Sequence, residues 1–189
     1  VIALETGMRM GEIFGLTWDC VDFKEGIIDI QKTLCYIPNN GDAIYEFHQT
    51  KTKAGKRKIP MTKKVKEVLL EQKKRKNQSI MRHPVAYPGM ENLVFCSKTN
   101  RPVHESNIRA AIRYRVNKIN EENPQIEFKA FTPHCLRHTF ATKAIDKGMR
   151  PKTLQKILGH NSLQMTMDLY CHVEESTLKT EMALIGEVV

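Results

Sequence analysis

Strand-type patterning is concentrated in one short part of this chain, and helical patterning occupies most of the rest. β-Branched and apolar residues dominate residues 27–37, and two further strand-like segments cover residues 43–50 and 56–61. The turn sequence Asn-Asn-Gly-Asp at residues 39–42 separates the first two segments, and a short basic turn at residues 51–55 separates the last two. The pattern predicts an α+β domain that is mostly α-helical, with a small antiparallel β-sheet near the N-terminal end.

Helical spacing of apolar residues marks the segments outside this region. The pattern at the N-terminus is interrupted by Gly7 and Gly11, which weaken it. In the last segment Leu178, Met182 and Ile185 recur at helical spacing, which suits either docking on a partner subunit or folding back onto the same chain. We expect helices at residues 1–16, 62–77, 104–122, 133–148, 151–158 and 174–188, and a brief strand at residues 93–97.

The charge balance favours a polyanionic partner. The 189-residue chain has 30 lysine and arginine residues against 21 aspartate and glutamate residues, a net charge of +9. A surplus of this size favours nucleic acid or an anionic membrane surface. No apolar run is long enough to span a bilayer. The five cysteines lie singly, without a C-x-x-C pair, which indicates a reducing, intracellular setting.

Two pairs of residues carry side chains suited to binding an anion. Arg9 lies between two glycines, and Glu12 follows three residues later on the same face, where it can hold the guanidinium in place. His134 and Arg137 are also three residues apart, so a titratable imidazole and a permanent cation emerge on one face of an expected helix. Taken singly, each pair also fits a solvated helix surface.

Further candidates lie in the basic turn and near the C-terminal end. His160 directly follows the helix-closing Gly159, and Tyr170 lies ten residues further on. A phenol has a pKa of about 10, so it becomes a nucleophile at neutral pH only when a base removes its proton and cations polarise its target. An ordinary packing tyrosine is the structural alternative. Lys51 can bring an ammonium to a reacting oxygen, and its neighbours form a landing site for a phosphate backbone: Lys53, Lys56, Arg57 and Lys58.

Four segments, taken in their order along the chain, resemble the signature sequences of the tyrosine recombinase (phage integrase) family: TGMRMGE, TKT, TPHCLRHTFAT and LGHNSLQMTMDLYCHV. The resemblance runs from Thr6 to about Val173, and it is strongest to the integrases of conjugative transposons and temperate phages. It implies the catalytic-domain fold of that family over residues 1–189. It also implies a site-specific recombinase that cleaves and rejoins DNA through a 3′-phosphotyrosyl intermediate, without metal or other cofactor, to integrate and excise a mobile element.

The resemblance implies a role for each residue at the phosphate. Tyr170 is expected to be the nucleophile. Arg9 and Arg137 are expected to clamp the non-bridging oxygens, an oxyanion-stabilising role, and His160 to add a hydrogen bond to the same phosphate. These positions match the family pattern one by one in the segments quoted above.

The remaining implied roles concern proton transfer. Lys51 is expected to protonate the leaving 5′-oxygen, with Lys53 as an alternative because residues two apart on a strand point to the same side. His134 is expected to assist proton transfer at the tyrosine, as base in cleavage and acid in rejoining. His138 and His172 lie nearby in sequence and are interpreted as neighbours without a catalytic role.

The same resemblance implies double-stranded DNA as partner and a homotetramer acting on two duplexes, with no membrane partner. We expect the protein in the bacterial cytoplasm, associated with the nucleoid. The chain begins at Val1, within an expected helix. We therefore expect it to be the catalytic part of a longer protein whose N-terminal DNA-binding domain or domains lie outside it.

Three alternatives remain open at this point. A zinc site is conceivable at His134 and His138, but the glutamate of a metalloprotease motif and the spacing of cysteine ligands are missing. A DNA-binding module without catalysis would suit the basic segment at residues 107–118. Within the family, a chromosome-dimer resolvase or a topoisomerase would use the same residues.

Overall fold

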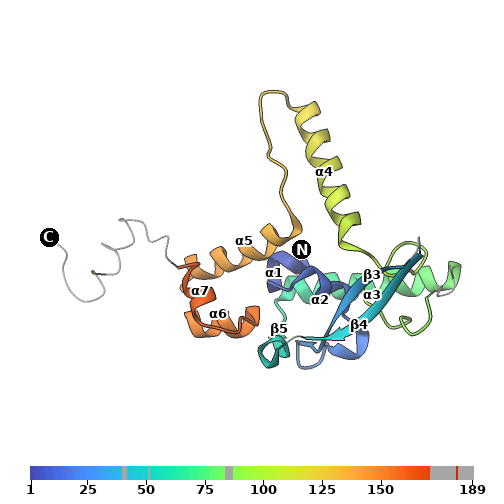
Figure 1. Ribbon diagram of the computed structural model, residues 1–189, viewed down its shortest axis with the longest axis horizontal. Helices are drawn as coiled ribbons and strands as arrows, with labels where there is room; N and C mark the ends of the chain where they lie inside the picture. The colour runs from blue at the N-terminus through green and yellow to red at the C-terminus, as the bar shows by residue number, and fades with distance from the viewer. Residues whose placement is uncertain (40–41, 51, 84–86, 171–181, 183–189) are drawn as a thin grey trace.

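The chain folds into a small strand region packed beside a larger set of helices (Figure 1). The structure is a computed structural model that describes residues 1–39, 42–50, 52–83, 87–170 and 182. The expected α+β, mostly helical architecture with antiparallel strands near the N-terminal end is confirmed. No helix among the described residues is both long enough and apolar enough to cross a membrane.

The N-terminal helical pattern is divided into two short helices, α1 (Ile2–Thr6) and α2 (Met10–Phe14). Gly7 ends α1 with a φ of 64°, in the left-handed region that favours glycine. Arg9 then adopts an extended conformation as the N-cap of α2, and the Glu12 carboxylate accepts a hydrogen bond from its backbone N–H at 2.8 Å. The single expected helix is therefore wrong, because the chain reverses at Gly7 and presents Arg9 at a helix start.

The strands form two antiparallel sheets rather than one. The first has the order β1 (Val21–Asp22), β2 (Ile27–Ile30), β5 (Arg57–Pro60), and the second pairs β3 (Lys32–Asn39) with β4 (Asp42–Gln49). The expected strand at residues 27–37 is broken at Gln31: Ile28 and Ile30 are buried beside β5, whereas β3 turns away to pair with β4. A short 3₁₀ helix, η1 (Trp18–Cys20), precedes β1, and a second, η2 (Lys53–Gly55), joins β4 to β5.

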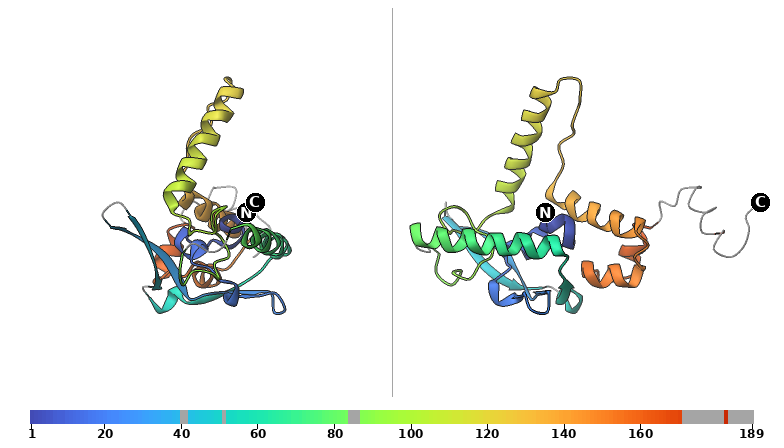
Figure 2. Two further views of the ribbon diagram at one scale, coloured as in Figure 1. Left: turned by 90° about the vertical axis from the view of Figure 1, so that its right-hand side faces the viewer. Right: turned by 180° about the vertical axis from the view of Figure 1, so that it is seen from behind.

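Within the described part of the chain, five further helices follow the strands. They are α3 (Lys63–Arg82), α4 (Glu105–Glu122), α5 (Pro133–Asp146), α6 (Pro151–Leu158) and the single-turn α7 (Gln164–Met167). Thr62 caps α3 by accepting a hydrogen bond from the Val65 N–H. α4 projects away from the body of the protein, and the chain returns beside it to α5 (Figures 1 and 2). The Asn120 side chain binds both backbone groups of Phe128, which ties the returning segment to α4.

Two apolar clusters hold these elements together. The larger joins α1, α2, the strands and α3, and includes the fully buried side chains of Met8, Ile28 and Leu69. The smaller joins α5 to α6 through Ala141, Ala144, Leu154 and Leu158. Because α6 contributes both of the leucines of the smaller cluster, its position relative to α5 is fixed by burial of apolar surface.

Two other expectations concern a strand at residues 93–97 and a helix at residues 174–188. Residues 93–97 do not form a strand; only Leu93 makes an isolated bridge, to Thr17. The expected helix at residues 174–188 lies outside the described residues, apart from residue 182.

The sharp reversal at Gly7 gives a first prediction. A Cβ at this position would lie 2.5 Å from a ring carbon of Phe140, and φ is 64°. The matched control is Gly26, where φ is 68° but no atom lies within 4 Å of where a Cβ would be. We expect Gly26→Ala to lower the free energy of unfolding by ~1 kcal/mol through the left-handed backbone alone, and Gly7→Ala by ~1–3 kcal/mol more through the clash. Urea unfolding of both variants measures this, and equal losses would contradict the packing at Gly7.

Candidate active site

Three arginines bind three consecutive carbonyl oxygens at the C-terminal end of α6. The donors are Arg57, Arg137 and Arg9, and the acceptors are, in the same order, the carbonyls of Ile157, Leu158 and Gly159, at 2.5, 2.8 and 3.4 Å. The last carbonyls of a helix lack intrahelical partners and lie at the negative end of its dipole, so cations are favourable there. The arrangement brings α2, β5 and α5 to one point, although they lie far apart in the sequence.

The chain turns at this point through Gly159, which has a φ of 67° and ends α6 in the left-handed conformation. A Cβ here would lie 2.9 Å from the Ala54 carbonyl oxygen and 3.0 Å from Nη1 of Arg57. The glycine therefore lets the basic turn between β4 and β5 approach the end of α6. It also places His160 directly beside the three arginines.

A buried carboxylate fixes two of the three guanidinium groups. Oε1 of Glu12 accepts hydrogen bonds from Nη1 of Arg57 at 2.9 Å and Nη1 of Arg9 at 3.0 Å, and Oε2 accepts from Nη2 of Arg57 at 2.8 Å. Burial alone would raise the pKa of the Glu12 carboxyl, but the hydrogen bonds and charges of Arg57 and Arg9 hold it below its ordinary value. Glu12 therefore stays ionised and orients both arginines.

Arg137 is buried and bridges two other parts of the site. Its Nη1 donates to the Gly7 carbonyl at 2.6 Å and its Nη2 to the Leu158 carbonyl at 2.8 Å. Burial, followed by the charge of Arg9, lowers the pKa of Arg137 to about 9, so the group remains cationic at neutral pH. A guanidinium has five N–H donors, so donors remain on Arg137 for a further acceptor.

His160 is half-buried and surrounded by cations. Burial, followed by the charges of Arg137, Arg9, Arg57 and His134, lowers the pKa of its imidazole from 6.5 to about 4. Its Nδ1 lies 2.9 Å from Oγ1 of Thr166, a fully buried side chain on α7. At neutral pH the ring is therefore uncharged, and the Thr166 hydroxyl holds it in place through one nitrogen.

The sequence-predicted residues divide into those that the structure brings together and those that it does not. Arg9, Arg137 and His160 meet at the end of α6, and His134, exposed on the first turn of α5, is close enough to affect His160 electrostatically. Lys51 lies outside the described residues, and Lys53 begins η2. Among the residues that the structure describes, no three His, Cys, Asp or Glu side chains form a group suited to a metal ion.

Tyr170 is held apart from the three arginines by other contacts. Its ring packs against the smaller apolar cluster, and its hydroxyl donates to the Met149 carbonyl. Burial raises the pKa of the Tyr170 hydroxyl above its ordinary value. The hydroxyl is thus protonated and bound to a backbone oxygen in this conformation, rather than directed at the arginine cluster.

The structure changes the interpretation of the basic turn. Lys56 is exposed, as expected of a DNA-contacting side chain, but Arg57 is only 5% exposed at its side chain and is paired with Glu12. It therefore faces the interior and not a DNA backbone. Alternation along β5, where Ile59 is buried and Lys58 exposed, is the sequence signal that would have placed Arg57 inside. Thr166 carried no such signal, because its contact depends on the fold between α6 and α7.

The surface beside the cluster is hollowed. A pocket of about 430 Å³ is lined by residues of α2, β3, the basic turn and the segment after α6, among them Arg9, Thr33, Thr52 and Asn161. The side chain of Arg9, which lines this pocket, is 43% exposed. A cationic side chain therefore lines a cavity that is accessible to an anion.

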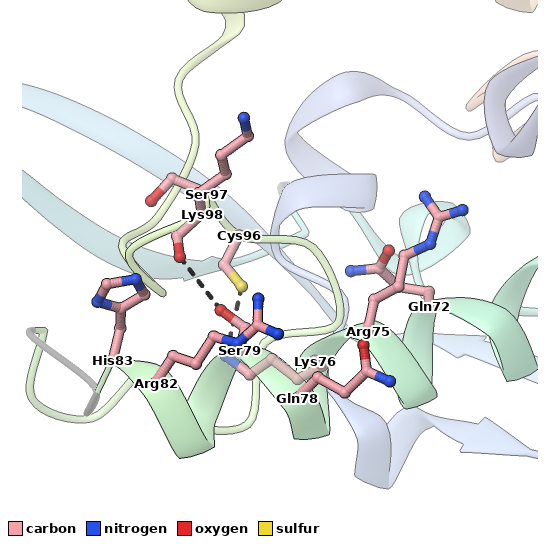
Figure 3. A pocket seen from close by; sticks show the side chains of 10 residues that line it. All are labelled: Gln72, Arg75, Lys76, Gln78, Ser79, Arg82, His83, Cys96, Ser97 and Lys98. Atoms are coloured by element: carbon pink, nitrogen blue, oxygen red, sulfur yellow. Dashed lines mark hydrogen bonds between the residues drawn. The ribbon is translucent and has the colours of Figure 1, made fainter.

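A second pocket, of about 500 Å³, lies away from this cluster, between α3 and residues 96–98 (Figure 3). Its lining is basic, but its polar groups bind one another: Nζ of Lys76 lies 3.4 Å from Sγ of Cys96, and the Ser79 hydroxyl donates to the Lys98 carbonyl. It contains none of the residues predicted for the reaction.

The fold that brings α2, α5 and the end of α6 together is that of a tyrosine recombinase catalytic domain. The chain matches the Phage integrase family over residues 1–177, and it belongs to that family. It is 33% identical to the transposase from transposon Tn916 of Enterococcus faecalis over 191 residues, 99% of this chain and 44% of that protein. It is 27% identical to a XerC-like tyrosine recombinase of Caldanaerobacter subterraneus subsp. tengcongensis over 180 residues, 92% of this chain and 44% of that protein.

Solved structures agree with this assignment. The fold is similar to the integrase of transposon Tn1549 in complex with transposon right end DNA, with a TM-score of 0.80 and 32% identity over 96% of this chain and 56% of that one. The same integrase in complex with circular intermediate DNA gives a TM-score of 0.78. The chain thus spans less than half of the two curated relatives and little more than half of the integrase chains.

The depressed pKa of His160 predicts a pH-dependent stability. Between pH 6.5 and about 4 the unfolded state takes up a proton on this imidazole that the folded state does not, so the free energy of unfolding falls as the pH falls through this window. We expect His160→Gln to lose this part of the pH dependence while other groups still titrate. Urea unfolding at pH 7, 6, 5 and 4 measures it. An unchanged slope in the variant would contradict a neutral, cation-surrounded His160.

Proposed function

We propose that this chain is the catalytic domain of a site-specific DNA recombinase, which cleaves and rejoins strands to integrate and excise a mobile element. The observation that carries the proposal is the convergence of Arg9, Arg137 and His160 at the end of α6. Two of these side chains are cationic and the third is a neutral hydrogen-bonding ring, a set suited to an anion, and the relatives named as transposases and integrases supply the class of substrate.

The proposed reaction is a pair of transesterifications. In cleavage the Tyr170 oxygen attacks the scissile phosphorus, an oxygen–phosphorus bond forms, and the bond from phosphorus to the 5′-oxygen breaks. The tyrosine proton passes to His134, and the leaving 5′-oxygen takes a proton from Lys51 or Lys53. In rejoining, a 5′-hydroxyl of a partner strand attacks the same phosphorus and releases the tyrosine, so the energy of the phosphodiester bond is conserved in the 3′-phosphotyrosyl link.

Arg9 and Arg137 are proposed to bind the non-bridging oxygens, whose negative charge grows in the transition state. His160 is neutral at pH 7, so its contribution is a hydrogen bond rather than a charge. We assign the donor role in the contact with Nδ1 to the Thr166 hydroxyl, so that the ring carries its proton on Nε2 and can donate it to the phosphate. Removing one such donor typically lowers the rate about 10²–10³-fold.

Attack requires a change at Tyr170. The hydroxyl has to exchange the Met149 carbonyl for the phosphate, and its proton has to leave despite the raised pKa. A phosphate held by the two arginines provides the polarised target that makes a phenol an adequate nucleophile.

The DNA-binding surface is proposed to include Lys56 and the projecting helix α4. The exposed cations of α4 are Arg109, Arg113, Arg115 and Lys118. α4 stands clear of the protein body (Figures 1 and 2), and the major groove of DNA admits an α-helix. We further propose double-stranded DNA as the partner, a tetramer on two duplexes as the working assembly, and N-terminal DNA-binding segments beyond this catalytic domain.

Covalent capture of DNA is the direct test of this function. With the full natural protein and a nicked suicide duplex, we expect a slowly migrating protein–DNA adduct that is absent in Tyr170→Phe, while the affinity for DNA stays within about threefold of wild type. The variant removes only the attacking oxygen, and denaturing electrophoresis detects the adduct. An adduct that persists in Tyr170→Phe would exclude this nucleophile. Wild-type binding without any adduct would instead favour a DNA-binding module.

Metal independence is a separate expectation. Because fixed arginines and a histidine are proposed to neutralise the phosphate, we expect the rate of adduct formation to be unchanged by an excess of EDTA over all divalent cations. The measurement compares time courses with and without EDTA at constant ionic strength, since DNA binding itself depends on salt. A loss of more than about tenfold that added Zn²⁺ or Mg²⁺ restores would contradict this part of the mechanism.

A further inference from the structure

We propose that Arg57 is a positioning residue for strand cleavage, which holds the basic turn between β4 and β5 against the phosphate-binding cluster. This role rests on the proposed function. The guanidinium is buried beneath the site, with a side-chain exposure of 5%, so it does not touch DNA. Its effect has to pass through the groups that it binds.

One planar guanidinium joins three parts of the site. Nε donates to the Ile157 carbonyl at the end of α6, at 2.5 Å. Nη1 donates to the Gly55 carbonyl in the basic turn at 3.1 Å and to Oε1 of Glu12 at 2.9 Å, and Nη2 donates to Oε2 of Glu12 at 2.8 Å. These four bonds need the flat fork of an arginine, and an ammonium on a flexible stem does not reproduce them.

The other parts of the cluster also have supports besides Arg57, although Glu12, which holds Arg9, is itself bound by Arg57. Arg9 is held by Glu12 through both its side chain and its backbone N–H. The end of α6 is held by Arg137, which donates to the Leu158 carbonyl and to the Gly7 carbonyl. Loss of the Arg57 fork would therefore leave the phosphate clamp with most of its attachments.

The basic turn depends on Arg57 more directly. Among its described residues, two hydrogen bonds are internal to the turn: the Gly55 N–H and the Thr50 hydroxyl both donate to the Thr52 carbonyl. The turn meets the cluster where Arg57 binds the Gly55 carbonyl, and where the Ala54 carbonyl packs closely on Gly159. Both candidates for the general acid, Lys51 and Lys53, belong to this turn. The effect of Arg57 is consequently expected on protonation of the leaving group rather than on charge stabilisation at the phosphate.

A change of leaving group separates these two effects. The full natural protein is tested on two suicide duplexes, one with the ordinary bridging 5′-oxygen and one with sulfur in its place. A thiol has a pKa of about 8.5, far below that of an alcohol, so the sulfur leaves as a thiolate without a general acid. We expect Arg57→Lys, which keeps the charge and loses the fork, to cleave the oxygen substrate about 10–10²-fold more slowly than wild type. On the sulfur substrate we expect a rate within about threefold of wild type.

The quantity measured is the ratio of the two rates in the same protein preparation, because this ratio does not depend on the fraction of molecules that are folded. The matched control is Arg75→Lys, at an exposed arginine on α3 paired with Glu71, for which the wild-type ratio is expected. In contrast, Glu12→Gln disturbs Arg9 directly and is expected to slow both substrates.

Three outcomes overturn the proposal or its basis. If Arg57→Lys slows both substrates equally, Arg57 only supports the fold. If it slows neither, the turn does not need it, and the positioning role is equally excluded. If wild type forms no Tyr170-dependent adduct with either substrate, the proposed function itself fails, and the role of Arg57 fails with it.

Discussion

The carboxyl end of α6 is the point on which the rest of the site depends. Its last carbonyl groups have no partners within the helix, and three arginines from β5, α5 and the start of α2 supply them. Each arginine arrives from a different region of the chain, so these hydrogen bonds define the tertiary arrangement as well as the charge of the site. The left-handed Gly159 completes it, because only a residue without a side chain allows the basic turn to come this close.

This arrangement concentrates positive charge before any ligand is present. Glu12 is the carboxylate that contacts the cluster among the described residues, and it neutralises one of three guanidinium charges. The backbone carbonyls offset part of the remaining repulsion through their dipoles. The consequence is visible at His160, whose pKa is lowered to about 4 by burial and by the same cations. Charges that disfavour protonation of His160 also favour binding of an anion. This is the electrostatic preorganisation that the proposed phosphoryl transfer requires.

The sequence predicted the convergence of Arg9, Arg137 and His160 only because their order resembles a family pattern; spacing alone left each of them with an ordinary surface explanation. Helical periodicity was sufficient for α4 and α6, whose bounds agree closely with the expected segments. Local patterning failed at Gly7, where a left-handed glycine divides the expected helix, and at Gln31, where the expected strand divides between two different partner strands. The charge of Arg57 favoured a place on the DNA surface, although the buried Ile59 two residues later on the same strand points inward with it. Because lysines surround Arg57 in the sequence, the alternation of inward and outward side chains along this strand was hard to recognise.

The end of α6 links the proposed phosphate site to the proposed nucleophile, Tyr170. The carbonyl oxygen of Leu158 accepts a hydrogen bond from Arg137, while its side chain, 1% exposed, packs in the apolar cluster on which Tyr170 rests. The same helix therefore positions both groups. It contacts the tyrosine through apolar packing, and it binds the arginines through hydrogen bonds. Apolar contacts are non-directional, whereas charge-assisted hydrogen bonds fix orientation. The arginines are consequently the oriented part of the site, and the proposed mechanism needs only the tyrosine to exchange the Met149 carbonyl for a phosphate.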